Sequence, residues 1–406
     1  VVAPLLFGTL ITGIAGHANL KELGRMGLKT LFYFEVVTTL ALIIGLVAIN
    51  FSKAGEGIKV ADEFKKKEAP TKQKTLTEKQ VQYLSYEVAK NAGAIPADSI
   101  AKYQGQQYKA DRPKQDWKEI VLHTFPENIA KSIAENEVLQ IVVFCIFFAI
   151  GLSKVKKDDR APILRFAHAL SEVMFKFTGV VMYIAPFGVG GAVAATVANL
   201  GIDVFKNLGL LVITLYAALF VFIFGVLFPI MFFLKIPIRK FIDAVIEPAS
   251  LAFAAASSEV ALPKALENMM KFGVSEKVVS FVIPTGYTFN LDGTTLYLSL
   301  AGVFVAQAAG IEMSIGQQIQ MVLTLMLTSK GVAAVPRASL VILTGTAATF
   351  GLPEWPIAAI FGIDAIMDMA RTSVNVIGNC LATVVIGKWE GEFHLGKDGS
   401  VKEVKV

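Results

Sequence analysis

Long apolar runs separated by short charged clusters dominate this chain. Runs such as Val36–Ile49, Val138–Leu152 and Leu208–Leu234 approach or exceed the roughly 20 residues that span the hydrocarbon core of a bilayer. A soluble core rarely contains several such runs. The pattern therefore predicts an all-α polytopic membrane protein.

The first half of the chain is expected to alternate membrane helices with one polar insert. Residues 1–27 are interpreted as the end of a truncated transmembrane helix and a cytoplasmic loop, because the sequence is apolar from the start and lacks an initiator Met. Residues 28–51 form the first complete span, and residues 52–118 form a polar extracytoplasmic insert. Segments 119–200 and 201–236 follow, with helices expected at about Ile129–Ser153, Pro162–Asn199 and Ile202–Ile236.

The second half contains apolar segments that polar motifs interrupt. Residues 237–276 contain AAASSEVALP, residues 277–310 contain NLDGTT, and residues 311–353 contain TSKGVAAVPRAS. Residues 354–390 are predicted to be an uninterrupted helix with a polar stripe, followed by a cytoplasmic tail at 391–406. Broken segments at corresponding places in two halves are typical of an inverted-repeat transporter, whose site lies between the broken helices.

Composition and charge also indicate a membrane protein. Charged residues make up 17% of the 406 positions, against about a quarter in soluble domains. The basic residues behind the net charge of +5 cluster in short loops, which the positive-inside rule places in the cytoplasm. The expected partner is the lipid bilayer and not nucleic acid. The histidines and cysteines show no metal-ligand spacing, so neither a cofactor nor a firm metal site is expected.

The last predicted helix carries the most informative polar residues. They recur at steps of three or four, which places them on one helical face: Asp364, Asp368, Arg371, Thr372, Asn375 and Asn379. Each charge at bilayer depth costs roughly 2.5–3.5 kcal/mol unless it faces the protein interior or water. The face is either a structural Asp–Arg pair or a binding surface, and Arg is well suited to gripping a carboxylate.

Further candidate residues lie outside this helix. Asn290–Thr294 would be a tight turn at a surface, but between two apolar runs it predicts buried unwound backbone and, with Asp292, a site for sodium or a proton. Ser258 and Val335 would lie at half-helix ends, whose N–H groups suit a carboxylate. Two isolated acids are either solvated or functional: Glu35 and Glu259.

These motifs make the chain similar to the dicarboxylate/amino acid:cation symporter family, which includes the glutamate transporters. The resemblance rests on ASSEVALP, NLDGT, SKGVAAVP and DMARTSVNVIGN, covers nearly all of the chain except the insert, and is closest to bacterial proton/glutamate symporters. It implies a homotrimer with a rigid scaffold (119–200) and a transport unit (28–51 and 201–236, with the segments that follow). It also implies two re-entrant hairpins (237–276 and 311–353) and an elevator-like movement.

The resemblance also implies roles for single residues. It places Asp368 on the substrate amino group, Arg371 on the side-chain carboxylate and Asn375 on the main-chain carboxylate. Dicarboxylate-selective relatives differ in the final helix and neutral amino-acid relatives lack the arginine, so an acidic amino acid is the expected substrate. Further substrate contacts are implied at Thr294, Thr372, Ser258 and Val335.

Departures from the family pattern concern the coupling ion. Sodium-coupled members have Met at Leu291, Asp at Asn379, and hydroxyl-bearing residues where Phe34 and Val37 align. The glutamate that carries the proton in animal members falls on Leu298. A site that loses an anionic ligand loses attraction for a hard cation, so proton coupling is predicted. The candidate ion-binding groups are Glu35, Glu259, Asp292 and Asp364, with a vestigial sodium site at Asn290, Asp292, Asn375 and Asn379.

The leading hypothesis is a proton-coupled symporter for glutamate or aspartate in the cytoplasmic (inner) membrane. The alternative is a sodium-coupled or C4-dicarboxylate symporter of the same fold. An intramembrane enzyme that uses Asp364 and Asp368 as paired acids is disfavoured. Such a catalyst needs one protonated carboxyl group, whereas Arg371 beside them would keep both ionised.

Overall fold

The computed structural model describes residues 20–58, 128–134, 138–328 and 338–394, together with residues 4, 7, 8, 11, 12, 125 and 126. Over these residues it is helical throughout, with one isolated β-bridge between Val274 and Phe393 and no strand. This confirms the all-α class. The principal helices are α2 (Leu20–Ser52), α7 (Ile129–Ala134), α8 (Val138–Ser153), α9 (Lys157–Leu200), α10 (Val204–Phe222), α11 (Phe228–Phe233), α12 (Ile238–Ala255), α13 (Ser258–Lys271), α14 (Glu276–Phe289), α15 (Asp292–Ala308), α16 (Ile315–Thr328), α17 (Ala338–Thr349), α18 (Trp355–Phe361) and α19 (Asp364–Glu390).

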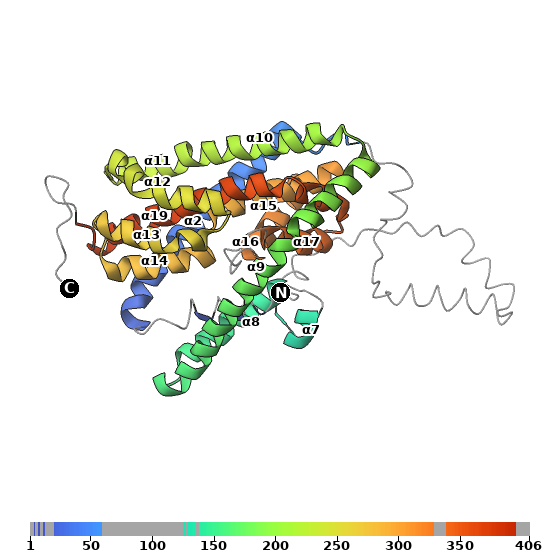
Figure 1. The fold of residues 1–406 in the computed structure, drawn as a ribbon. Helices are drawn as coiled ribbons and strands as arrows, with labels where there is room; N and C mark the ends of the chain where they lie inside the picture. Colours follow the sequence, from blue (N-terminus) through green and yellow to red (C-terminus); the bar gives the residue numbers. More distant parts are fainter. Residues whose placement is uncertain are drawn as a thin grey trace, which may run out of the picture.

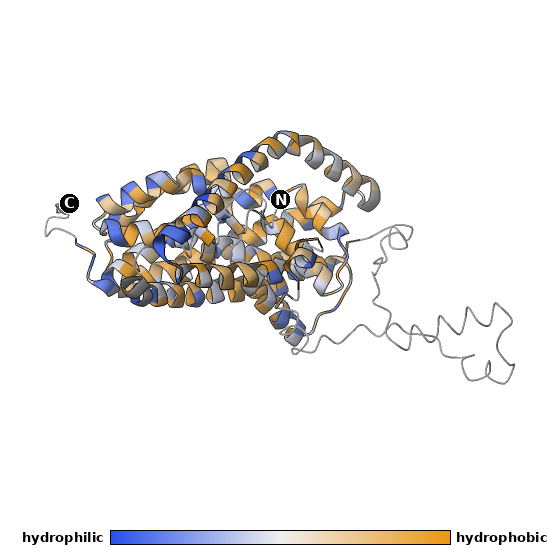
Figure 2. Cartoon of the chain, turned by 90° about the horizontal axis from the view of Figure 1, so that it is seen from below, coloured by the Kyte–Doolittle hydropathy of each residue, from blue (hydrophilic) through white to orange (hydrophobic). Residues whose placement is uncertain are grey.

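Three helical stretches among the described residues are long and apolar enough to cross a membrane. They are Arg25–Ser52, Val204–Phe233 and Asp364–Glu390. The second combines α10 and α11, which a π-helical turn at Ile223–Leu227 joins without a break. Figure 2 shows apolar residues over most of the helix surfaces, with hydrophilic residues more frequent at one end of the bundle. The chain is thus built as a multi-pass membrane protein.

A tight contact between α2 and α15 forms the centre of the bundle. Helix α15 is buried along nearly its whole length. At Gly45 of α2, a side chain would clash with the Leu296 carbonyl and the Ser299 hydroxyl, so only glycine permits this approach. Helix α19 packs against α12, α14 and α15, which brings its polar face into the same core.

Helices α12 and α13 fold back on each other as a hairpin. The Asn268 side chain donates to the Ala244 carbonyl at 2.9 Å, and Lys264 forms an ion pair with Glu247 at 3.3 Å. The turn lies at Ala256, which has the left-handed φ of 48°, and at the extended Ser257. The break predicted within AAASSEVALP is therefore confirmed.

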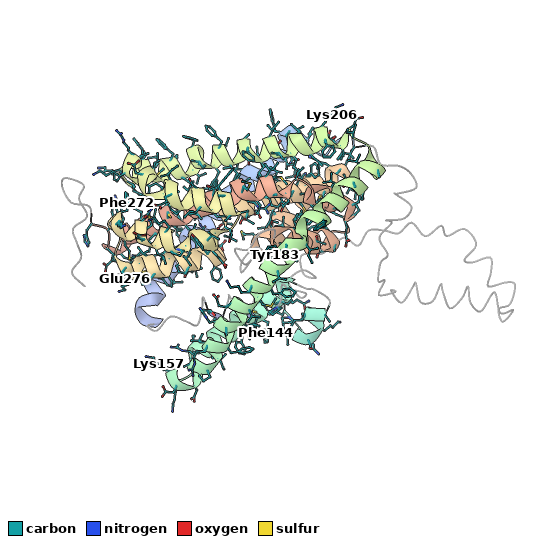
Figure 3. All side chains as sticks on the ribbon, in the orientation of Figure 1. Phe144, Lys157, Tyr183, Lys206, Phe272 and Glu276 are labelled. Carbon is teal, nitrogen blue, oxygen red and sulfur yellow. The ribbon has the colours of Figure 1, made fainter. Side chains whose placement is uncertain are left out.

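Helix α9 is the longest of the described helices. Figure 1 shows it running diagonally past the other helices. Its first half packs on α8 through Ala167, which lies in a small cluster with Ala149 and Leu152. Figure 3 places Lys157 at its outer end and Tyr183 midway along it, and the Tyr183 side chain is exposed.

Several predicted boundaries differ from the structure. Helix α2 starts at Leu20, so residues 20–27 are helical and not loop. Helix α9 starts at Lys157, since Asp158 and Asp159 in its first turn favour a helix N-terminus. The stretch expected at Ile129–Ser153 contains two separate helices, α7 and α8.

The prediction that 354–390 is uninterrupted was wrong. The chain forms two helices, α18 and α19, which meet at Gly362 and Ile363. A side chain at Gly362 would come within 2.6 Å of the Val193 side chain of α9, so α18 lies directly on α9. The change of direction lets α18 pack on α9 while α19 enters the core. Residues 59–118 of the predicted insert, 119–124 of the segment after it, 329–337 of the second predicted hairpin and 395–406 lie outside the described residues.

Candidate functional site

The polar stripe of α19 is buried in the core. Its predicted members face α14 and α15 and have at most 5% exposure: Asp364, Asp368, Arg371, Thr372, Asn375 and Asn379. The three-to-four-residue spacing read from the sequence does place them on one face. Buried polar groups need partners, and the partners divide the stripe into two clusters.

The first cluster surrounds Arg371. Its Nη1 lies 2.9 Å from Asp364 Oδ1, its Nη2 lies 3.4 Å from Asp364 Oδ2, and its Nε lies 2.9 Å from Asp368 Oδ1. The Tyr297 ring of α15 covers the guanidinium, with 4.1 Å between Cζ and the ring centroid. The Thr372 hydroxyl donates to Asp368 Oδ1 at 3.4 Å. Two carboxylates and one guanidinium give this cluster a net charge of −1.

Asn375 joins the stripe to the start of α15. Its Oδ1 accepts from the Gly293 and Thr294 backbone N–H groups at 2.8 and 3.2 Å. Its Nδ2 donates to the Thr294 hydroxyl at 2.9 Å. Asn375 thus caps a helix N-terminus from another helix. A side chain at Gly293 would clash with the Arg371 carbonyl, so glycine is required for this close approach.

The second cluster lies around the break between α14 and α15. Asn290 Nδ2 donates to Asp292 Oδ2 at 3.0 Å and to Asn379 Oδ1 at 3.4 Å. In return, Asn379 Nδ2 donates to the Asn290 carbonyl at 3.1 Å and to the Asn375 carbonyl at 3.0 Å. Gly378 allows Asp292 to approach the α19 backbone. We call this set (Asn290, Asp292, Asn375 carbonyl, Asn379) the amide cluster.

The sequence analysis did not identify Thr38 as a residue of this cluster. This residue of α2 is 1% exposed, and its hydroxyl donates to Asn290 Oδ1 at 3.4 Å. Phe34 and Val37, which the sequence analysis named as departures from the sodium-coupled family members, are also buried and lie on the same side of α2. A polar residue four positions after Phe34 on the buried face is the signal that could have found Thr38.

The remaining predicted residues lie in different surroundings. Ser258 is buried at the first residue of α13, which packs on α19, while Glu259 next to it is half-buried. Glu35 lies on the exposed face of α2, opposite the buried Phe34 and Val37. Val335 lies outside the described residues. Within the part of the chain that the structure describes, no group of three His, Cys, Asp or Glu side chains could hold a metal ion.

Comparison with known proteins shows the family of the chain. The model of the sodium:dicarboxylate symporter family matches residues 1–389. The proton/glutamate-aspartate symporter of Escherichia coli (strain K12) is 38% identical over 397 residues, which cover 98% of this chain and 84% of the relative. The proton/sodium-glutamate symport protein of Bacillus caldotenax is 38% identical over 394 residues, covering 97% and 85%.

Other relatives are named as transporters of C4-dicarboxylates. The C4-dicarboxylate transport protein of Bacillus subtilis (strain 168) is 36% identical over 398 residues, which cover 98% of this chain and 86% of the relative. Because the family match covers nearly the whole chain, and the buried polar stripe lies in the part that it covers, the protein belongs to the sodium:dicarboxylate symporter family.

Proposed function

We propose that this protein is a symporter that takes up glutamate or aspartate together with protons. The observation that carries the proposal is the buried Arg371 between Asp364 and Asp368. A buried ion cluster of this kind adds little to stability compared with packed apolar side chains, so its presence supports a binding role. Relatives named as glutamate or glutamate-aspartate symporters support the choice of substrate.

Binding would proceed by exchange of partners around the guanidinium. The substrate side-chain carboxylate replaces a carboxylate on Arg371, and Asp368 turns to the substrate ammonium group. Thr372, already hydrogen-bonded to Asp368, lies beside that group. Asn375 and Thr294 bind the main-chain carboxylate, and Ser258 and the backbone near Val335 complete the site.

Charge balance gives a reason for coupling to a cation. The Arg371 cluster has a net charge of −1 before binding, and an acidic amino acid adds another −1. An uncompensated charge in a dry site is very costly. A cation bound close by offsets this charge, and the amide cluster is the place next to the substrate site where carbonyls and Asp292 lie together.

The amide cluster favours a proton over sodium as this cation. Asn379 Nδ2 donates to the carbonyls of Asn290 and Asn375, so an amide nitrogen stands between two oxygens that a sodium ion would need. A neutral amide also lacks the negative charge that compensates for the dehydration of a hard cation. Sodium coupling remains the second candidate, because a relative of similar identity is named a proton/sodium-glutamate symport protein.

The finer architecture belongs to the same proposal. The α12–α13 hairpin and the pair α16 and α17 would be the two re-entrant hairpins, packed with α2, α10, α14, α15, α18 and α19 in a transport unit. Helices α7 to α9 would form the scaffold of a homotrimer in the inner membrane. The transport unit would move against this scaffold in an elevator-like movement. The exposed apolar side chains of α9, such as Tyr183 and Phe187, suit contact with lipid or with another subunit.

Uptake by proteoliposomes with the sodium and proton gradients imposed separately tests the proposal. We expect glutamate or aspartate uptake that runs on an inward proton gradient and persists when choline replaces sodium. A rise in substrate affinity of about tenfold on adding sodium, which corresponds to about 1.4 kcal/mol, would overturn the proton assignment. Uptake of succinate in preference to amino acids would overturn the substrate assignment.

A further inference from the structure

An acidic residue ends α19 where a negative charge is unfavourable. Glu390 is the last residue of the helix, at the negative end of the helix dipole, and its side chain is only 10% exposed. Two cations from the start of α2 offset this cost. Arg25 Nη2 lies 2.6 Å from Glu390 Oε2, and Lys29 Nζ lies 2.7 Å from Glu390 Oε1. Lys29 also donates to the Trp389 carbonyl at 2.9 Å.

This contact lies at one end of the bundle. Figure 1 shows the first turns of α2 and the last turn of α19 at the same end, and Figure 3 places Phe272 and Glu276 there too. Helix α19 is fixed at this end from another side, because Lys388 Nζ donates to the carbonyl of Leu234, just after α11. The partners of Glu390 therefore join the start of α2 to an end of α19 that Lys388 also holds.

From this end, contacts between α2 and α14, α15 and α19 continue toward the amide cluster. The Tyr33 ring packs edge-on against Trp389, with 6.2 Å between centroids. One position on, Phe34 lies beside the close approach of Gly286 and Asn379. One turn further, Thr38 donates to Asn290. The residues that pair with Glu390 and the residue that reaches the amide cluster thus belong to the same helix, with Thr38 nine positions after Lys29.

The register of α2 matters for the amide cluster because the Thr38 bond is long. The 3.4 Å between Thr38 Oγ1 and Asn290 Oδ1 is near the outer limit of a hydrogen bond, so a small slide of α2 breaks it. Phe34 would move against Gly286 and Asn379 at the same time. The cation region is therefore sensitive to the position of α2, whereas the contacts of Arg371 given above come from α15 and α19.

We infer that Glu390 is a positioning residue for the coupling-cation region, because its pairing with Lys29 and Arg25 sets the register of α2 against α19. The inference rests on the proposed cation-coupled symport. Glu390 touches neither the substrate nor the cation in this proposal. It acts through α2, on which Thr38 and Phe34 face the amide cluster.

The test compares variants of the full chain in proteoliposomes. Glu390→Gln removes the charge, Lys29→Gln removes the better buried cation, and Arg25→Gln removes a cation whose side chain is 73% exposed. Asp203→Asn is the matched control, since it breaks a 2.7 Å ion pair with Lys206 whose side chains are both exposed. For each variant, the pH or sodium concentration that gives half-maximal uptake is measured separately from the substrate KM at saturating cation.

We expect Glu390→Gln to shift the half-saturating cation concentration by about fivefold, with a smaller shift in Lys29→Gln and the smallest in Arg25→Gln. The substrate KM at saturating cation and the response of Asp203→Asn should stay at wild-type values. If Glu390→Gln does not fold, Lys29→Gln provides the test.

An unchanged cation dependence in active Glu390→Gln and Lys29→Gln would overturn the inference. A loss of thermal stability with proportionate loss of maximal uptake, and no change in cation dependence, would show a purely structural role and overturn it too. Wild-type uptake that needs neither gradient would instead overturn the proposed symport, and the inference with it.

Discussion

Two buried clusters on the same helix stabilise their polar groups in different ways. The Arg371 cluster uses full charges, with two carboxylates on one guanidinium. The amide cluster, one to two turns further along α19, relies mainly on amide–carbonyl hydrogen bonds through Asn290 and Asn379. A site for an anionic substrate has to keep a positive charge, and the cost of burying it is met by the two acids. In the proposed function the amide cluster handles a proton, which does not need a full set of anionic ligands.

The comparison predicts which ligand each cluster controls. Changes at the Arg371 cluster should alter substrate affinity and selectivity. Changes at the amide cluster should alter the dependence on the cation.

Removing the guanidinium should have the largest effect. Arg371→Ala is expected to abolish binding of glutamate and aspartate, because a buried substrate carboxylate loses a charge-assisted contact worth several kcal/mol. The variant should also lose about 3–5 kcal/mol of stability, since Asp364 and Asp368 lose their buried partner. Calorimetry measures binding, and thermal unfolding measures stability.

A matched double variant separates these two losses. Arg371→Ala with Asp364→Asn removes one of the orphaned charges, so stability should recover in part while binding stays absent. Recovery of binding together with stability would show that Arg371 is a structural ion-pair partner.

Neutralising Asp368 should change selectivity. Asp368→Asn is expected to weaken glutamate binding by about tenfold to a hundredfold more than succinate binding, because only the amino acid has an ammonium group and such a charged hydrogen bond is worth about 1.5–3 kcal/mol. Competition binding with the two ligands measures the ratio. Equal weakening of both would mean that Asp368 serves only to hold Arg371.

The stripe of α19 and the broken helices could be predicted because local rules determine them. Charged and amide residues at three-to-four-residue steps can only form one face of a helix, and a polar N-x-D-G motif between apolar runs has to interrupt them. The three-to-four-residue spacing was enough to place Arg371 and Asn379 on the polar face of the last helix. Their partners follow from tertiary packing, so the sequence alone left a closed ion pair and a binding surface as alternatives.

Features that depend on a distant element could not be predicted. Helical spacing from Phe34 could place Thr38 on the buried face of α2, but its partner Asn290 lies 252 positions away and follows only from tertiary packing. The break between α18 and α19 lies where Gly362 packs against Val193 of α9, a residue far from it in the sequence. The ion pair between Arg25 and Glu390 joins residues 365 positions apart, so no local pattern predicts it.

Restoring a carboxylate at the amide cluster should create a response to sodium. Asn379→Asp removes the amide donor from the carbonyls of Asn290 and Asn375 and adds a negative charge beside them. We expect sodium to raise the substrate affinity of this variant by about tenfold, or about 1.4 kcal/mol, while wild type responds less. Substrate titrations in sodium and in choline measure this. A variant that ignores sodium would show that Asn379 does not determine the choice of ion.

The smallest and most discriminating effect should come from two matched hydroxyls. Thr38 donates to Asn290 in the amide cluster, and Thr372 donates to Asp368 in the Arg371 cluster, each at 3.4 Å. Valine has nearly the same shape as threonine but cannot donate, so Thr38→Val and Thr372→Val each remove one long hydrogen bond. Such a bond contributes about 0.5–1.5 kcal/mol, which corresponds to roughly a twofold to tenfold change.

The two variants should differ in which titration moves. Thr38→Val should shift the half-saturating pH or sodium concentration and leave the substrate KM at saturating cation unchanged. Thr372→Val should raise the substrate KM and leave the cation dependence unchanged. Because the two bonds have the same length and both residues are buried, a general loss of stability would affect both variants alike and cannot produce opposite patterns. If both variants shift both titrations, the two clusters act as one site, and the division between substrate and cation along α19 is wrong.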